Sequence, residues 1–263
     1  MTGRLSQLDE RMAALETAAG RATLTSAFCD VPPCAPVLHP DRLEVRVDRT
    51  PGASGTWSPP RRDVQGVGAL VLGVRVALAG QGWAVEVDRL PRPDDPELVA
   101  VLRPVARALE AGLAPLAAVA AGGPLGRRTT RARVPSPTLL SHLGRVAALE
   151  GAVLVPITSD DGRRAVEEFD REAGSVLGHA SGAATGAGER ADRDVFLLLA
   201  TEADDELAAL RSGEALERVL LELAHRGWTA SVVPSALAVP LVRAEARSAL
   251  CWDDHPQALI RIG

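Results

Sequence analysis

The sequence contains no tyrosine, three phenylalanines, three cysteines and no long apolar run. Cys29, Cys34 and Cys251 show neither a Cys-x-x-Cys pair nor a zinc-like Cys/His spacing, so reduced thiols are expected rather than disulfides or a metal site. No stretch reaches the roughly 18 apolar residues of a membrane-spanning helix. The N-terminus is charged where a signal peptide would be apolar, which predicts a cytoplasmic protein without a membrane partner.

An excess of positive charge is also lacking. The formal net charge is −5 at pH 7 and the pI is about 5.6, so a nucleic-acid partner is not expected. Hydrophobic residues make up 46% of the chain and charged residues 24%, which is typical of a soluble globular protein. A length of 263 residues permits one large domain or two small ones.

The usual catalytic motifs are absent as well. The chain has no phosphate-binding loop, no Gly-x-Ser-x-Gly elbow and no His-Glu-x-x-His. Gly66-Val-Gly68 begins a dinucleotide-binding pattern, but it lacks both a preceding strand and a third glycine. The five histidines show no ligand-like spacing, and only His39, in a proline-rich loop, is retained as a site candidate. No catalytic residue is therefore predicted.

What the chain does contain is a repeat. The stretch from Gly68 to Trp83 matches the stretch from Gly213 to Trp228 without a gap, and each runs from an apolar helix into a strand. A second, weaker match joins 99–103 to 257–261 in the same order. The repeat predicts two similar halves, 1–126 and 127–263, that form a pseudo-dimer in one chain. Chance similarity between Ala/Leu-rich helices is the alternative.

Hydrophobic periodicity predicts an α+β protein, with mixed sheets flanked by helices. Residues 98–102 could be a strand or the start of a helix, and the small, polar segment 174–191 is expected to be mobile. Helices are predicted at 4–20, 63–80, 105–119, 137–149, 160–173 and 204–227. Strands are predicted at 43–47, 83–87, 152–157, 195–200, 228–233 and 258–263.

One dense basic cluster follows the glycine-rich break at 122–126. It consists of Arg127, Arg128 and Arg131, with Thr129 and Thr130 between them. Guanidinium groups and hydroxyls together suit a phosphate monoester, which they bind by charge-assisted hydrogen bonds. A solvated basic linker between the two halves is the alternative.

Several strings resemble the nitroreductase superfamily, and more narrowly its Acg-like subgroup of actinobacterial, single-chain, FMN-binding proteins. They are 197–207, 213–224, Val239-Pro240 with Arg243, and 255–263. The resemblance implies a nitroreductase-like fold of two pseudo-symmetric halves that imitates the usual homodimer. It also implies that Arg127, Arg128, Thr129 and Arg131 hold the FMN phosphate.

The flavin-site motifs depart from the family pattern. Ala35-Pro36 matches, but the serine, asparagine and Gln-Pro-Trp that line the flavin in relatives are replaced by the sequence from Val37 to Arg42. Pro36 and His39 are expected near the flavin ring, and Ala238 stands where the family often has glutamate.

The resemblance therefore implies two functions. One is an FMN-dependent NAD(P)H oxidoreductase that works as a monomeric pseudo-dimer, with further self-association left open. The other is an inactive pseudoenzyme that sequesters FMN or binds another protein.

Overall fold

The computed structural model describes residues 2–22, 34–47, 61–122, 134–178, 195–233, 236–251 and 253–262. They belong to two compact units, Met1–Leu125 and Gly126–Gly263, which are called the first and the second unit below. None of the described helices has the length and apolar character needed to cross a membrane. The predicted mobile segment 174–191 lies outside the described residues from position 179 onwards.

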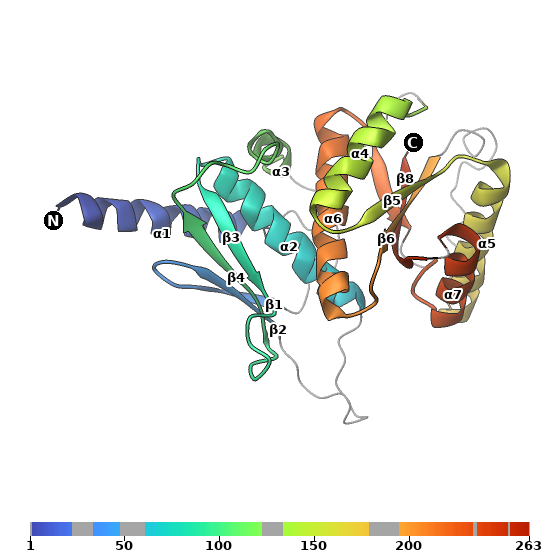
Figure 1. The fold of residues 1–263 in the computed structure, drawn as a ribbon, viewed down its shortest axis with the longest axis horizontal. Coiled ribbons are helices and arrows are strands. Elements are labelled where there is room, and N and C mark those ends of the chain that lie inside the picture. Colours follow the sequence, from blue (N-terminus) through green and yellow to red (C-terminus); the bar gives the residue numbers. More distant parts are fainter. Residues whose placement is uncertain are drawn as a thin grey trace. The chain divides into compact units, whose positions relative to one another are not determined.

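The first unit is a four-stranded sheet with helices, in the strand order β1-β2-β4-β3 (Figure 1). All of its described strand pairs are antiparallel. Helix α1 packs along α2, and α2 contacts β3 and β4. The elements are α1 (Thr2–Ala22), β1 (Cys34–Leu38), β2 (Leu43–Val47), α2 (Arg61–Ala79), β3 (Ala84–Arg89), β4 (Leu98–Val105), the 3₁₀ helix η1 (Ala114–Leu116) and α3 (Ala117–Ala120).

The second unit is built in the same way, with the strand order β5-β6-β8-β7 and antiparallel pairing throughout. Side chains cap three of its helices: Ser136, Ser159 and Asp205 accept backbone hydrogen bonds from the first turns of α4, α5 and α6. Its elements are α4 (Pro137–Leu149), β5 (Val153–Ile157), α5 (Asp160–Val176), β6 (Val195–Thr201), α6 (Glu206–His225), β7 (Ala230–Val233), α7 (Pro240–Leu250) and β8 (His255–Ile262).

The α+β class is confirmed, and both units repeat one strand order. The expected mixture of parallel and antiparallel strands differs from the structure, because every described strand pair is antiparallel. The predicted helix over 105–119 is also wrong for most of its length. Gly112 has a φ of 86°, a left-handed conformation that a helix cannot contain, and only η1 and α3 follow it. Residues 98–102 are part of a strand.

The repeat extends to the pairing register. In each sheet the register shifts once, between Val45 and Arg46 in β2 and between Leu199 and Ala200 in β6. Val87 pairs with Leu102, while Val232 pairs with Ile260. These are corresponding positions of the two sequence matches, so both matches fall on equivalent strands of the two sheets. Each matched Gly-Trp turn needs its glycine, because Gly82 and Gly227 have φ values of 83° and 73°.

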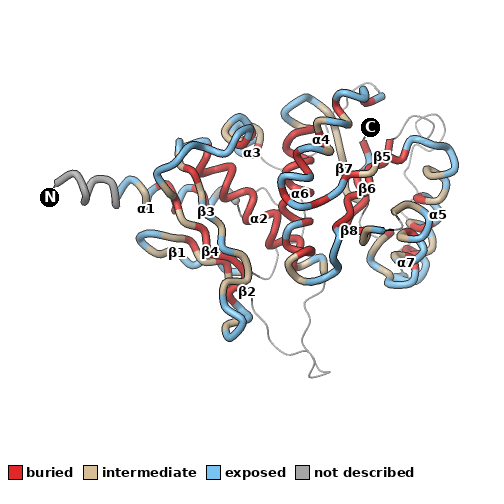
Figure 2. Tube along the Cα trace, viewed as in Figure 1, coloured by how far each residue is buried: buried red, intermediate tan, exposed pale blue. Residues whose placement is uncertain are grey.

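The two sheets differ in what covers their second face. In the second unit, α5 and α7 enclose an apolar cluster that includes Phe169, Leu198 and Leu259. In the first unit, a turn from His39 to Arg42 replaces α5, and the register position of Leu198 is held by Glu44. Burial follows this difference between the corresponding central strands: every residue of β6 is buried, whereas buried and half-buried positions alternate along β2 (Figure 2).

Arg243 fastens α7 to the second sheet. Its Nη1 and Nη2 donate to the two carboxylate oxygens of Asp204 at 2.9 and 2.6 Å, and its Nε donates to the carbonyl of Pro256 at 2.7 Å. Arg243→Ala is expected to lower the free energy of unfolding by about 1–2 kcal/mol, because three charge-assisted bonds are lost at a partly exposed site. Urea unfolding measures the change. Arg243→Lys should recover little of the loss, since lysine lacks the planar fork; full recovery by lysine would contradict this account.

Candidate functional site

His39 lies in a charged cluster on the outer side of the first sheet. Its Nε2 is 3.4 Å from Glu44 Oε1, which is an ion-pair distance without hydrogen-bond geometry. Arg42 Nε donates to the same oxygen at 2.9 Å. Arg46 extends the cluster, with Nη1 3.5 Å from Glu44 Oε2 and Nη2 2.8 Å from Asp95 Oδ1. The only proposed histidine of the site is thus held inside a network of surface charges.

Glu44 is the centre of that cluster. Its side chain is 13% exposed, and burial alone raises its pKa. The hydrogen bond from Arg42 and the charges of His39 and Arg42 outweigh burial, so the pKa of Glu44 lies below its usual value. A carboxylate held ionised by its partners is a poor proton donor at neutral pH. The cluster therefore supports the turn and supplies no acid for catalysis.

Pro36 lies on the other face of the same sheet. It pairs with Val45, which is fully buried, whereas Val37 pairs with Glu44 on the outer face. Because successive strand residues point to opposite faces, Pro36 belongs to the buried side and the ring of His39 to the charged side. The structure does not bring these two predicted flavin-site residues together. A flavin ring lined by both from one side does not fit the described geometry.

The predicted phosphate-binding residues Arg127, Arg128, Thr129 and Arg131 lie outside the described residues. Their role as phosphate ligands stays a prediction, and so does the alternative of a solvated linker. Ala238, at the position where nitroreductases often have glutamate, precedes α7 in the second unit.

Cysteine and metal chemistry find little support in the described part of the chain. Burial raises the pKa of Cys34 to about 11, so its thiol stays protonated and weakly nucleophilic at neutral pH. Burial and the charge of Asp254 raise the pKa of Cys251 as well. Cys34 and Cys251 are free thiols, and Cys29 lies outside the described residues. Among the described residues, no group of three or more His, Cys, Asp or Glu side chains could hold a metal ion.

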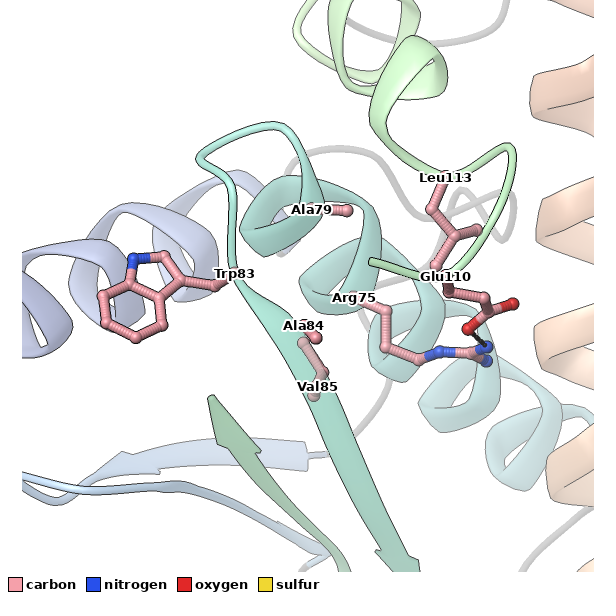
Figure 3. Close-up of a pocket in the computed structure, with 7 residues that line it drawn as sticks. All are labelled: Arg75, Ala79, Trp83, Ala84, Val85, Glu110 and Leu113. Atoms are coloured by element: carbon pink, nitrogen blue, oxygen red, sulfur yellow. Dashed lines mark hydrogen bonds and ion pairs between the residues drawn. The ribbon is translucent and has the colours of Figure 1, made fainter. Parts of the chain in front are cut away.

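A small cavity in the first unit lies beside the Arg75–Glu110 ion pair (Figure 3). Arg75 Nη2 donates to Glu110 Oε2 at 2.6 Å, with the Arg75 side chain 8% exposed. The cavity has a volume of about 10 Å³, which is room for one water-sized probe and for no organic ligand. Figure 3 shows the Trp83 indole directed toward α1, away from the ion pair. On that side Arg11 lies over the ring, 5.7 Å from its centroid.

A much larger hollow, of about 430 Å³, opens on the second unit beside the matching Trp228. Its described walls come from the residues just before α4, from α4 itself and from the turn between α6 and β7. None of His142, Arg145, Arg226 and Trp228 was among the site residues predicted from the sequence. A usable signal was the helical spacing of Thr138, His142 and Arg145, which places them along one side of α4. The lining residues are Val134, Ser136, Thr138, Leu139, His142, Arg145, Arg226 and Trp228.

Comparisons with known proteins found a distant likeness among solved structures. No family model matches the chain, and no curated protein matches it. Among solved structures, the chain is similar to a nitroreductase with bound FMN from Desulfitobacterium hafniense, at 14% sequence identity and a TM-score of 0.38. The match covers 51% of this chain and 80% of that one. A likeness of this size assigns neither a family nor a ligand to this chain.

Proposed function

We propose that the chain is a nitroreductase-like protein that binds FMN, with Arg127, Arg128, Thr129 and Arg131 on the phosphate group. The observation that carries the proposal is the repeated unit: one strand order and one bulge position occur in both sheets. We infer that the two units arose by internal duplication. A single chain that contains two nitroreductase-like subunits, as the sequence resemblance implies, would have two such repeated units.

The arginine cluster supplies the chemistry of the proposed phosphate site. Three guanidinium groups within five positions carry enough donors for two or more bidentate contacts to a phosphate dianion. When bound, FMN would supply hydride transfer between NAD(P)H and an electrophile. The protein's own part would be to bind and orient the flavin, because Glu44, the carboxylate beside His39, is held ionised by Arg42 and is a poor proton donor.

A second candidate function is that of a pseudoenzyme that sequesters FMN or binds another protein. A specific observation favours it: Pro36 and His39 lie on opposite faces of the first sheet, and His39 is held by Glu44. The segment expected at the flavin ring therefore forms an edge strand and a turn of the first sheet. On this reading the phosphate contacts persist while the ring-side groups have been lost.

The visible absorption spectrum of purified protein tests FMN binding. We expect flavin absorbance that is lost in Arg128→Ala/Arg131→Ala, with FMN affinity reduced about 100-fold because two charge-assisted contacts, near 3 kcal/mol together, are removed. Arg164→Ala/Arg171→Ala is the matched control, since both arginines are largely exposed on α5. A colourless protein that ignores added FMN would contradict the proposal.

Turnover separates the two candidate functions. A flavin oxidoreductase should oxidise NADH or NADPH steadily when a quinone or nitroaromatic compound is present. A pseudoenzyme that only stores FMN should bind the flavin with the same arginine dependence and show no such oxidation above that of free FMN.

A further inference from the structure

We propose that the hollow beside Trp228 binds an organic anion that carries a planar ring, with Arg145 and Arg226 near the charge and Trp228 near the ring. None of the described residues that line the hollow is predicted to bind FMN, and the inference concerns a second ligand beyond the proposed function. Its volume of about 430 Å³ lies in the range of small-molecule sites, about 300–1,000 Å³.

A buried carboxylate organises two of the walls. Glu222 has a side chain only 5% exposed, and its Oε2 lies 3.0 Å from His142 Nε2 on α4. The same oxygen accepts a hydrogen bond from Arg226, whose Nη1 also donates to the Glu222 carbonyl at 3.2 Å. Since one fixed group holds both side chains, the imidazole and the guanidinium keep their positions before any ligand arrives. Preorganised donors of this kind reduce the entropy lost on binding.

The charge of the hollow is positive. Glu222 offsets one guanidinium charge, that of Arg226, whereas the described residues give Arg145 no ion pair. Arg226 also keeps donors beyond the Nη1 that faces Glu222, because a guanidinium carries five N–H groups. The hydroxyls of Ser136 and Thr138 add neutral hydrogen-bonding groups to the rim. An anion is therefore the ligand that this wall recognises.

The indole adds a preference for a flat ligand. Trp228 follows the turn at Gly227 and lines the hollow, and its partner in the repeat, Trp83, has the Arg11 guanidinium over its ring. Arg11 shows that a planar cationic group can lie against the equivalent indole of the first unit. Because Trp228 lines the hollow, a planar ring bound there can lie against the indole or a guanidinium while its anionic group meets Arg145.

Three probes separate the contributions of charge and ring: AMP carries both, inorganic phosphate carries the charge alone, and adenosine carries the ring alone. We expect AMP to quench tryptophan fluorescence saturably and to bind more tightly than either of the others. Trp228→Phe should remove the quenching while calorimetry still detects binding. Equal affinity for AMP and phosphate, or for AMP and adenosine, would overturn the assignment.

Arg145→Ala gives the sharpest variant, because Arg145 is exposed and its loss should leave the fold intact. We expect AMP affinity to fall about tenfold, the effect of one lost charge-assisted contact. Arg164→Ala, an exposed arginine on α5, is the matched control. A dissociation constant for AMP weaker than about 1 mM, which corresponds to a binding free energy of about −4 kcal/mol, would overturn the proposal.

The site is also distinguishable from the FMN site. Arg128→Ala/Arg131→Ala should abolish flavin absorbance and leave AMP affinity unchanged, whereas Arg145→Ala should lower AMP affinity about tenfold and leave flavin absorbance unchanged. If the double variant lost AMP binding as well, the hollow would not be a separate site and the inference would be wrong. The result would leave the proposed FMN function untouched.

Discussion

Arg218→Ala is expected to lower the free energy of unfolding of the second unit by about 3–5 kcal/mol. Arg218 on α6 donates from Nη1 to Glu150 Oε1 at 2.5 Å, and the two side chains are 1% and 2% exposed. Removal of the guanidinium leaves a carboxylate buried without this partner. The folded state then carries the desolvation cost of the buried Glu150 carboxylate, and the attraction of the Arg218 guanidinium no longer offsets that cost. Thermal and urea unfolding measure the loss.

Glu150→Gln and a double-mutant cycle test the cause. The cycle should show strong coupling, because the second substitution removes the charge that the first leaves unpaired. Arg218→Met/Glu150→Met is expected to be more stable than Arg218→Ala alone, since an apolar pair of similar volume carries no buried charge. Additive effects of the two single substitutions would show that the ion pair is not the source of the loss.

Leu198→Glu should destabilise the second unit by more than about 3 kcal/mol. Leu198 is fully buried in the cluster that α5 and α7 cover, so a carboxylate there would lose its hydration and replace apolar contacts. At the matching register of the first unit, Glu44 is tolerated because Arg42 and Arg46 reach it. Limited proteolysis should show α5 and α7 becoming accessible together.

Leu198→Met is the control for that experiment, because it keeps both the volume and the apolar character and should cost less than about 1.5 kcal/mol. A second comparison is Glu44→Gln, which removes a charge from the first unit without burying one. If Leu198→Glu left stability within about 1 kcal/mol of the parent protein, the apolar cluster would not be what holds the two helices to the sheet.

Much of the fold could be predicted because local patterns and tertiary burial agree. The alternation of Leu43, Val45 and Val47 with charged residues gave β2 its observed bounds, and the predicted helix at 137–149 coincides with α4. The helix α7 was not predicted. Its first residue is Pro240, which often begins a helix, but only two of its side chains, Val242 and Ala246, are buried, so its apolar periodicity is weak.

The site was harder to predict, because its geometry depends on pairings that the sequence does not display. Four prolines between 29 and 41 indicated an extended loop, yet only pairing with β2 decides that Pro36 and His39 lie on opposite faces. The hollow beside Trp228 depends on Glu222, which joins α4 to the end of α6 across a long stretch of sequence. No local pattern reports a contact of that kind.

The different coverings of the two sheets restrict how either unit can change. Without α5 and α7, Leu198 and Leu259 would leave an exposed apolar surface that favours aggregation. If two such helices instead covered a charged position such as Glu44, they would bury an ion. Neither change is neutral alone. In either unit, a change in the covering helices would therefore require a matching change at the strand positions beneath them.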